Sequence, residues 1–485
     1  MNTKIDQVCA LSELDIFQKP IYQTSVNRYK YVSINPSGDI QKGALPMTFN
    51  INKSENEYID LSNIFCYVKC SIRKIGDNSL LASNVAVSPV NNFMHSLFSE
   101  IQIINDKSDK PLITSNYPIK SFYENLLNYG SEGKSAHLQS ELFIKDDHKF
   151  MNITTLTKQE VKNEAQTSSL QQNQVNKDVF NAADTDSTMN EDDGESTIEV
   201  DIKTTSVVKY AANAGLVFRK KRFDVRECKM YGKLHADLFS CNKYFPNTIS
   251  NLTIIMKKND DKFLLKGEDN IAKLYTVQIE SIYLDVKKVS IDNDVLLAHS
   301  ATLAKGHNII LPFSKVVIDK RKIETQSKEV TLANLYPDKF PKRLIIGFVA
   351  NEAASSHTVN PFNFEFFKLK EIKFKIDNDT FKSYEFDEKF QSIKAYHSLF
   401  TDTGINISDS SIDISLEEHS SGYGLIAVDL SRDGCSSEVH FNLDRKGTFD
   451  IELKFSDALS APIWAVIYNE YDSLLQIDNF KNVIF

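Results

Sequence analysis

The sequence predicts an all-β protein made of two similar β-domains in tandem, and three observations support this. Apolar and polar residues alternate with a period of two along many short segments. The chain has 31 Phe and 19 Tyr but one Trp, a mixture that favours strands over helices. Two distant stretches, 90–103 and 359–374, each run from an Asn-containing turn through aromatic residues into an alternating strand. This repetition indicates two related domains with a structural rather than a catalytic purpose.

The predicted strands follow from this alternation, taken in chain order. Segment 252–256 is continuously apolar and predicts a strand buried on both faces. A long strand over 275–291 alternates and should be half-buried. Segment 344–349 again predicts burial on both faces, whereas 372–376 and 449–455 alternate. Asn, Asp, Gly and Pro clusters separate these segments, a spacing typical of sandwiches and jelly rolls.

One helix is expected over 121–129. It follows Pro118, places Phe122, Leu126 and Tyr129 on one face, and can end at Gly130. A single short helix in a β-domain usually lies in a long connection between strands.

The same patterns divide the chain into domains. We predict an N-terminal arm over 1–30, a first β-domain over 31–292 and a second over 293–485. Residues 154–196 are rich in Gln, Asn, Ser, Thr and Asp and poor in aromatics, which predicts a mobile polar and acidic insertion. The insertion is a solvated loop or, alternatively, an exposed loop that meets a partner.

Composition restricts the possible functions. The 485 residues carry a net charge of −9 with a pI near 5.7, so the whole chain has no electrostatic attraction to nucleic acid. The N-terminus lacks the apolar core of a secretory signal, and no apolar run approaches the roughly 20 residues of a membrane span. We expect a soluble protein made in the cytosol. Cys66 and Cys70 share one face of an expected strand and are predicted to be buried thiols.

No motif for catalysis or metal binding is complete. Residues 130–135 resemble a phosphate-binding loop, but two residues separate the glycines where four are needed. Residues 429–434 match part of a calcium loop, but His440 occupies the position of the bidentate acid. His95 and His397 each begin the sequence His-Ser-Leu-Phe and are interpreted as structural histidines. We therefore predict no enzyme activity, no cofactor and no metal site.

The only dense basic run comprises Arg219, Lys220, Lys221 and Arg222. Its simplest interpretation is a solvated loop. The alternatives are a nuclear-import signal or a patch that faces nucleic acid.

Several blocks of sequence resemble one known family. They include YIDLSNIFCYVKCSI from Tyr58, PVNNFMHSLFSEIQI from Pro89, YPIKSFYENLLNYG from Tyr117, FPKRLIIGFV from Phe340 and IYNEYDSLLQID from Ile467. Together they are similar to the major capsid protein of Polinton (Maverick) elements and related adintovirus-type viruses. The blocks occur in family order over nearly the whole chain. The Gln/Asn-rich insertion after Thr154 departs from the family pattern by its length.

The resemblance implies a double jelly roll, two tandem eight-stranded antiparallel β-sandwiches with a few short helices in loops. It also implies a homotrimer that forms a pseudo-hexameric capsomer and tiles an icosahedral virus shell. The implied partners are further copies of the chain and the penton and minor capsid proteins of the same element, with little or no sequence-specific nucleic-acid binding. The implied location is the virion, after synthesis in the host cytoplasm and with nuclear import for assembly as one option.

In addition to the insertion, two groups of residues are candidates for assembly contacts. They are Leu14, Asp15, Ile16 and Phe17 of the N-terminal arm, and Phe122, Tyr123 and Leu126 of the expected helix.

Two other functions remain open from the sequence. A jelly roll can be a glycan- or receptor-binding module, and the family also has copies resident in cellular genomes, so the chain could be a domesticated capsid protein. An enzyme on a cupin scaffold would need clustered His and carboxylate ligands on its strands, and the sequence shows no such cluster.

Overall fold

The structure is a computed structural model and describes residues 22–38, 46–108, 110–152, 197–200, 208–211, 213–389, 391–405 and 411–484. The arm candidates at 14–17 and the insertion predicted over 154–196 lie outside these residues.

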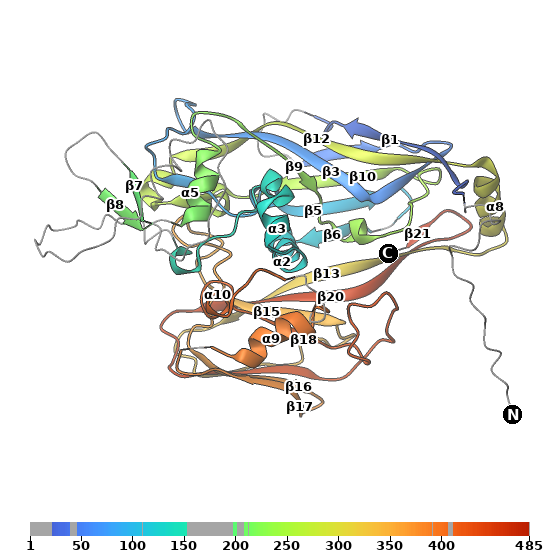
Figure 1. The fold of residues 1–485 in the computed structure, drawn as a ribbon. Helices are drawn as coiled ribbons and strands as arrows, with labels where there is room; N and C mark the ends of the chain where they lie inside the picture. Colours follow the sequence, from blue (N-terminus) through green and yellow to red (C-terminus); the bar gives the residue numbers. More distant parts are fainter. Residues whose placement is uncertain are drawn as a thin grey trace, which may run out of the picture.

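The first sandwich contains two four-stranded antiparallel sheets (Figure 1). One has the order β1 (Val26–Ile34), β12 (Tyr275–Ile291), β3 (Glu57–Lys74), β9 (Cys228–Lys233). The other has the order β2 (Met47–Ile51), β10 (Leu252–Lys258), β5 (Phe98–Asn105), β6 (Leu112–Ser115). Strand β1 begins within the segment predicted as the arm and pairs with β12 along its length. The N-terminal edge of the first sandwich is therefore formed by residues on both sides of position 30.

The second sandwich repeats the first strand by strand. Its sheets have the orders β13 (Ile309–Ile323), β20 (Ile463–Ile477), β15 (Arg343–Ala350), β18 (Leu425–Asp429) and β14 (Glu329–Leu332), β19 (Phe449–Phe455), β16 (Leu369–Ile376), β17 (Asp379–Glu385). A short strand, β21 (Val483–Ile484), adds to β20. Both sandwiches have the strand order of a jelly roll, so the predicted double jelly roll is confirmed.

The repeat seen in the sequence has a topological cause. Strand β5 lies between β10 and β6, and β16 lies between β19 and β17, which are equivalent positions in the two sandwiches. Ile101 faces Met256 in the first ladder, and Phe374 faces Ile451 in the second. Stretches 90–103 and 359–374 are therefore the same connection and strand in two copies of one fold.

Two small pairs of strands lie outside the main sheets. Strand β4 (Val87–Pro89) pairs with β11 (Leu265–Gly267), and β7 (Thr197–Val200) pairs with β8 (Val208–Ala211). The β7–β8 pair stands away from the body of the first sandwich at the left of Figure 1.

Helices occupy the connections between strands. The described helices are α1 (Phe93–Ser96), α2 (Tyr117–Asn128), α3 (Ser131–Ser135), α5 (Ala214–Lys221), α6 (Asp261–Leu264), α7 (Asp269–Ala272), α8 (Asn293–Ala304), α9 (Ile393–Thr401) and α10 (Leu416–Ser420), with 3₁₀ turns η3 (His137–Glu141), η4 (His148–Phe150) and η7 (Asp237–Ser240). The predicted helix over 121–129 is α2, which begins earlier because Pro118 is accommodated in its first turn. Helix α8 was not predicted; the Asp292 carboxylate caps it by accepting a hydrogen bond from Asp294 N.

Burial separates two strands that look alike in sequence. Strand β15 is buried at Leu344 through Val349, as predicted. Strand β10 alternates instead, with Leu252, Ile254 and Met256 buried and the residues between them half-exposed, so the prediction of two buried faces is wrong there. The cause is position: β10 faces its own sandwich core on one side, whereas β15 lies between two cores.

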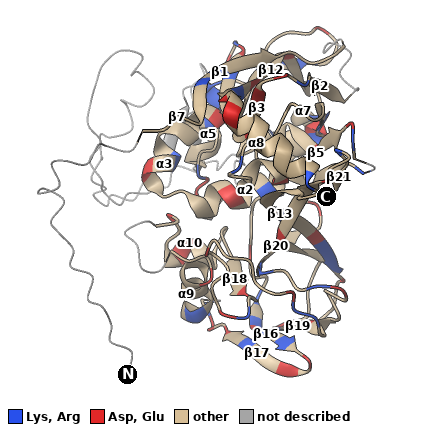
Figure 2. Cartoon of the chain, turned by 90° about the vertical axis from the view of Figure 1, so that its right-hand side faces the viewer, with Lys and Arg blue, Asp and Glu red and all other residues tan. Residues whose placement is uncertain are grey.

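One hydrophobic core crosses both sandwiches. It fills the first sandwich and continues onto the outer face of the β13–β20–β15–β18 sheet, where it includes Phe313, Ile345 and Tyr468. A second core fills the second sandwich. Cys66 and Cys70 are fully buried in the shared core, as predicted. In the view of Figure 2, basic and acidic segments both occur in both sandwiches. No helix in the described ranges is long and apolar enough to cross a bilayer.

Candidate functional site at the junction of the two sandwiches

Helix α2 places its aromatic residues between the two sandwiches. The ring of Phe122 stacks on Phe362 of the second half, with centroids 4.1 Å apart and planes 6° from parallel. Tyr123 stacks on Tyr468 at 5.6 Å. Phe122, Tyr123 and Leu126 are all buried. These three assembly candidates thus pack inside the chain and join its two halves.

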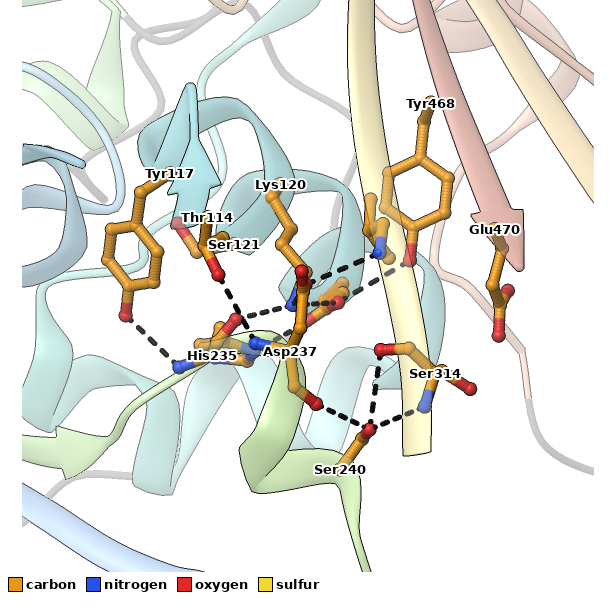
Figure 3. A network of polar contacts seen from close by, with 12 residues as sticks. Thr114, Tyr117, Lys120, Ser121, His235, Asp237, Ser240, Ser314, Tyr468 and Glu470 are labelled. Carbon is orange, nitrogen blue, oxygen red and sulfur yellow. Dashed lines mark hydrogen bonds and ion pairs between the residues drawn. The ribbon is translucent and has the colours of Figure 1, made fainter. Parts of the chain in front are cut away.

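The polar side of α2 carries a cluster of charges (Figure 3). Lys120 Nζ lies 3.0 Å from Glu124 Oε1 and 3.3 Å from Asp237 Oδ1. Glu124 Oε2 lies 2.6 Å from Nδ1 of His235. Burial by itself would raise the pKa of Glu124, but the Lys120 ammonium and the contact with His235 outweigh it and lower the pKa to about 2. Burial raises the pKa of Asp237 despite Lys120. Glu124 is therefore the firmly ionised partner of Lys120.

This cluster is connected to the second sandwich. Tyr468 donates a hydrogen bond to Glu124 at 3.4 Å, and the backbone N–H of Val316 donates to Asp237 at 3.3 Å. The N–H of Ser314 donates to the Ser240 hydroxyl at 2.9 Å (Figure 3). The junction is thus held by polar contacts as well as by the stacked rings.

A cavity of about 260 Å³ opens between the sandwiches beside this cluster. Lys120, Glu124 and His235 line it from the first sandwich, and Arg343 and Glu470 line it from the second. The Arg343 guanidinium lies 2.5 Å from Glu470 Oε2, so each wall holds an ion pair of its own. The polar contacts that cross the junction are those of Tyr468, Val316 and Ser314 described above.

His95 lies in the same polar region, buried under α2. Its Nδ1 is 2.8 Å from the hydroxyl of Tyr117, and its Nε2 is 3.0 Å from Glu141 Oε2. Burial lowers the pKa of His95, although the Glu141 carboxylate acts in the opposite direction. The two His-Ser-Leu-Phe sequences lie in different helices, because His95 is in α1 and His397 is in α9.

Helix α5 and its C-cap place the four residues of the basic run in different environments. Arg219 points inward and is fully buried, with its guanidinium 2.7 Å from Asp146 Oδ1. Lys220 is half-buried and donates to the carbonyl of Ser83 at 2.7 Å. Lys221 and Arg222 are exposed. The surface part of the run is therefore smaller than the sequence indicates.

The sequence by itself indicated none of the four charged or polar residues of the junction cluster, which are Lys120, Glu124, His235 and Asp237. Lys120 and Glu124 could have been noticed as an ion pair four residues apart on a helix. His235 and Asp237 follow β9 and gave no local signal, because the fold alone brings them to α2.

No model of an established protein family matches the chain. An uncharacterized protein of Caenorhabditis elegans, F54H12.2, is 20% identical over 479 residues, which cover 96% of this chain and 99% of the nematode protein.

Several similar solved structures are viral. The Sputnik virophage structure contains a chain with a TM-score of 0.55 and 9% identity, covering 99% of this chain and 92% of that chain. The Faustovirus major capsid protein has a TM-score of 0.52 and 10% identity, covering 95% and 92%. A chain of the PBCV-1 virus capsid has a TM-score of 0.50 and 8% identity, covering 97% and 99%. Over nearly its whole length, the chain shares the double jelly-roll fold of these viral proteins.

Proposed function

We propose that the chain is a major capsid protein of the Polinton/Maverick and adintovirus type, which self-assembles into pseudo-hexameric homotrimers that tile an icosahedral shell. The observation that carries the proposal is the strand-by-strand repetition of one jelly roll within a single chain. Three such chains around a threefold axis present six similar sandwiches. A unit of that shape can occupy near-hexagonal sites in a lattice.

The comparisons support this proposal at the level of the fold. In each of three viral structures, the similarity covers at least 92% of the viral chain and at least 95% of this chain. The sequence blocks from Tyr58, Pro89 and Tyr117 all lie in the first sandwich or its connections, and they resemble the same class of protein. The proposed location is the virion, with penton and minor capsid proteins as partners.

The proposed role is structural and not enzymatic. At the junction cavity, Lys120, Glu124, Arg343 and Glu470 are engaged in ion pairs, which hold the fold together. Assembly would be driven by the burial of apolar and polar surface between copies. The net charge of −9 leaves the packing of the genome to more basic proteins.

The mass of the purified full chain in solution tests the proposal. Three chains of 55.1 kDa give roughly 165 kDa, the mass expected of a closed trimer. Light scattering would measure the mass, and negative-stain imaging of the same sample would show a six-lobed outline. A monodisperse monomer at every concentration would reject the capsomer and favour a glycan- or receptor-binding sandwich, which a glycan array would then test.

A second candidate function is a domesticated cellular copy of the capsid protein. The end-to-end similarity to a nematode protein favours it. Both candidates predict a trimer, so particle formation separates them. A viral protein is expected to be found in DNA-containing particles, and a domesticated copy that has lost this role is not.

A further inference from the structure

Three side chains that commonly bind metals meet beneath α2, and they come from three separate connections of the first sandwich. His95 is in α1, Glu141 ends η3, and His235 follows β9. One ligand atom from each lies within 4.8 Å of the other two. His95 and Glu141 are buried, and His235 is half-buried at the wall of the junction cavity.

Outer contacts orient both imidazoles. Nδ1 of His235 lies 2.6 Å from Glu124 Oε2, and its Nε2 makes no hydrogen bond within the described residues. Nδ1 of His95 lies 2.8 Å from the hydroxyl of Tyr117. A carboxylate or hydroxyl on one ring nitrogen fixes the tautomer and leaves the other nitrogen available to a metal ion. Figure 3 shows His235 and Tyr117 side by side next to α2.

We propose that His95, Glu141 and His235 form a binding site for a divalent transition-metal ion, with zinc as the preferred ion. Two imidazoles and a carboxylate are a ligand set suited to zinc, with a fourth position left for water. Zinc ligands at about 2.1 Å in a tetrahedron lie roughly 3.4 Å apart. His95 Nε2 and Glu141 Oε2 are 3.0 Å apart, and the ligand atom of His235 lies within 4.8 Å of the other two ligand atoms. A movement of about 1.5 Å by His235 would close the site, which is within reach of a side-chain rotation.

The charge of the surroundings also favours a cation. Near the site, the Lys120 ammonium contacts the carboxyl groups of Glu124 and Asp237, and a third carboxyl group, that of Glu141, contacts His95. With neutral imidazoles and ionised carboxyl groups, this set has a formal charge of −2, which a divalent ion balances. Buried charges are stable only when they are paired or bind a metal.

An unpartnered oxygen lies next to the site. Asn125 is fully buried, and its Nδ2 lies 3.3 Å from Glu141 Oε2. Its Oδ1 has no hydrogen-bond partner among the described residues. The Nδ2 group also donates to Asn92 Oδ1 at 3.1 Å, so these two hydrogen bonds hold the amide with its oxygen unpaired.

The bound ion would act as a cross-link. It would join the connection before β5, the connection after β6 and the segment after β9 at the surface that faces the second sandwich. The inference does not depend on the proposed capsid role, because it rests only on residues within one chain.

Zinc content and affinity of the purified full chain test the site. We expect one zinc ion per chain by elemental analysis, and a higher melting temperature with zinc than after chelation. Cobalt substitution should give a tetrahedral spectrum without a thiolate band. Glu124→Gln should weaken zinc affinity about 10–100-fold, as is usual for loss of an outer contact. His235→Gln, which removes a ligand, should weaken it further.

The matched control is His137→Gln, because His137 is an exposed histidine at the other end of η3. This variant should keep wild-type affinity. His235→Gln should melt at the same temperature as the chelated wild type, which would show that it folds. The proposal is overturned if the wild type binds no zinc, if His235→Gln binds zinc as tightly as the wild type, or if the cobalt spectrum shows thiolate ligands.

Discussion

Single buried charges in this chain differ in whether they have a counter-ion. Arg219 is paired with Asp146 at 2.7 Å. Lys266 of β11 is equally buried, but its hydrogen bonds within the described residues go to the carbonyls of Lys262, at 3.1 Å, and Ser356, at 2.8 Å. With no carboxylate against it, burial lowers the pKa of Lys266 to about 7. Lys266 therefore connects the two halves through its hydrogen bonds. Near pH 7 its amine lies close to its pKa.

This residue predicts a pH dependence of stability. Between about pH 7 and its ordinary pKa of 10.5, Lys266 is protonated in the unfolded chain and neutral in the folded one. The unfolded state then binds more protons, so the free energy of unfolding rises with pH over this window. Below about pH 7 the full penalty of the buried ammonium is present. Relative to Lys266→Met, the wild type should gain about 2 kcal/mol between pH 7 and pH 9.

Urea unfolding of both proteins at several pH values measures this difference. The Lys266→Met variant is the control for every other titrating group. Parallel curves for the two proteins over pH 7–9 would contradict the prediction.

At the scale of elements, helix α5 shows how one helix can divide a basic sequence. Asn213 caps it by accepting a hydrogen bond from Leu216 N. Near its end, Arg219 turns inward to Asp146 and to the carbonyls of Pro89 and Ile144. Asp146 in turn accepts from Asn360 of the second half at 3.2 Å. The helix is therefore anchored through its most buried charge, which is connected to both sandwiches.

We expect Arg219→Ala to destabilise the protein by about 3–5 kcal/mol, because it leaves Asp146 buried without its counter-ion. The exposed Arg222→Ala should change stability by about 0.5 kcal/mol or less. Chemical unfolding of the two variants gives the comparison. Equal and small effects would mean that the Arg219 pair contributes little.

The strands and helices also show which features of the fold could be predicted from the sequence. Alternation located β12, β16 and β19 because each has one face on a core. It could not tell that β15 packs between two cores and β10 beside one, since a continuous apolar run is compatible with both. Helix α8 has no fully buried residue, and only Val295 and Leu296 pack on a core cluster, so its clearest sequence signal is its cap.

The junction residues could not be predicted for a different reason. Phe122, Leu126 and Tyr129 were recognised as one face of a helix, but the sequence does not say what that face packs against. His95, Glu141 and His235 are 46 and 94 residues apart along the chain, and they share no spacing that a motif would capture. These three residues are close together only because the fold brings three separate connections to the same place beneath α2.

At the scale of the whole molecule, the two sandwiches are equivalent in topology but share one core. That core extends from β3 of the first half to Val466 and Tyr468 of the second. Removing either half would expose Phe122 and Phe362, which now stack on each other. The halves should therefore depend on each other for stability.

We expect calorimetry of the full chain to show one unfolding transition instead of two. A shared core couples the halves, so that neither is stable once the other has unfolded. Phe122→Ala should lower the transition temperature without splitting the peak if the coupling is distributed over the junction. Two resolved peaks in the wild-type protein would show that the sandwiches unfold independently.

The position of α8 has a practical consequence. It connects the two halves at one end of the molecule, where Figure 1 shows it outside both sandwiches, and none of its residues is buried. A chain cut after His299, whose Nδ1 lies 3.0 Å from the hydroxyl of Tyr58, keeps every strand of both jelly rolls and the packing of Val295 and Leu296 on the first sandwich. The fragments on either side of the cut would then behave as a split-protein pair, each poorly soluble when made alone and recovering the native fold when the two are produced together.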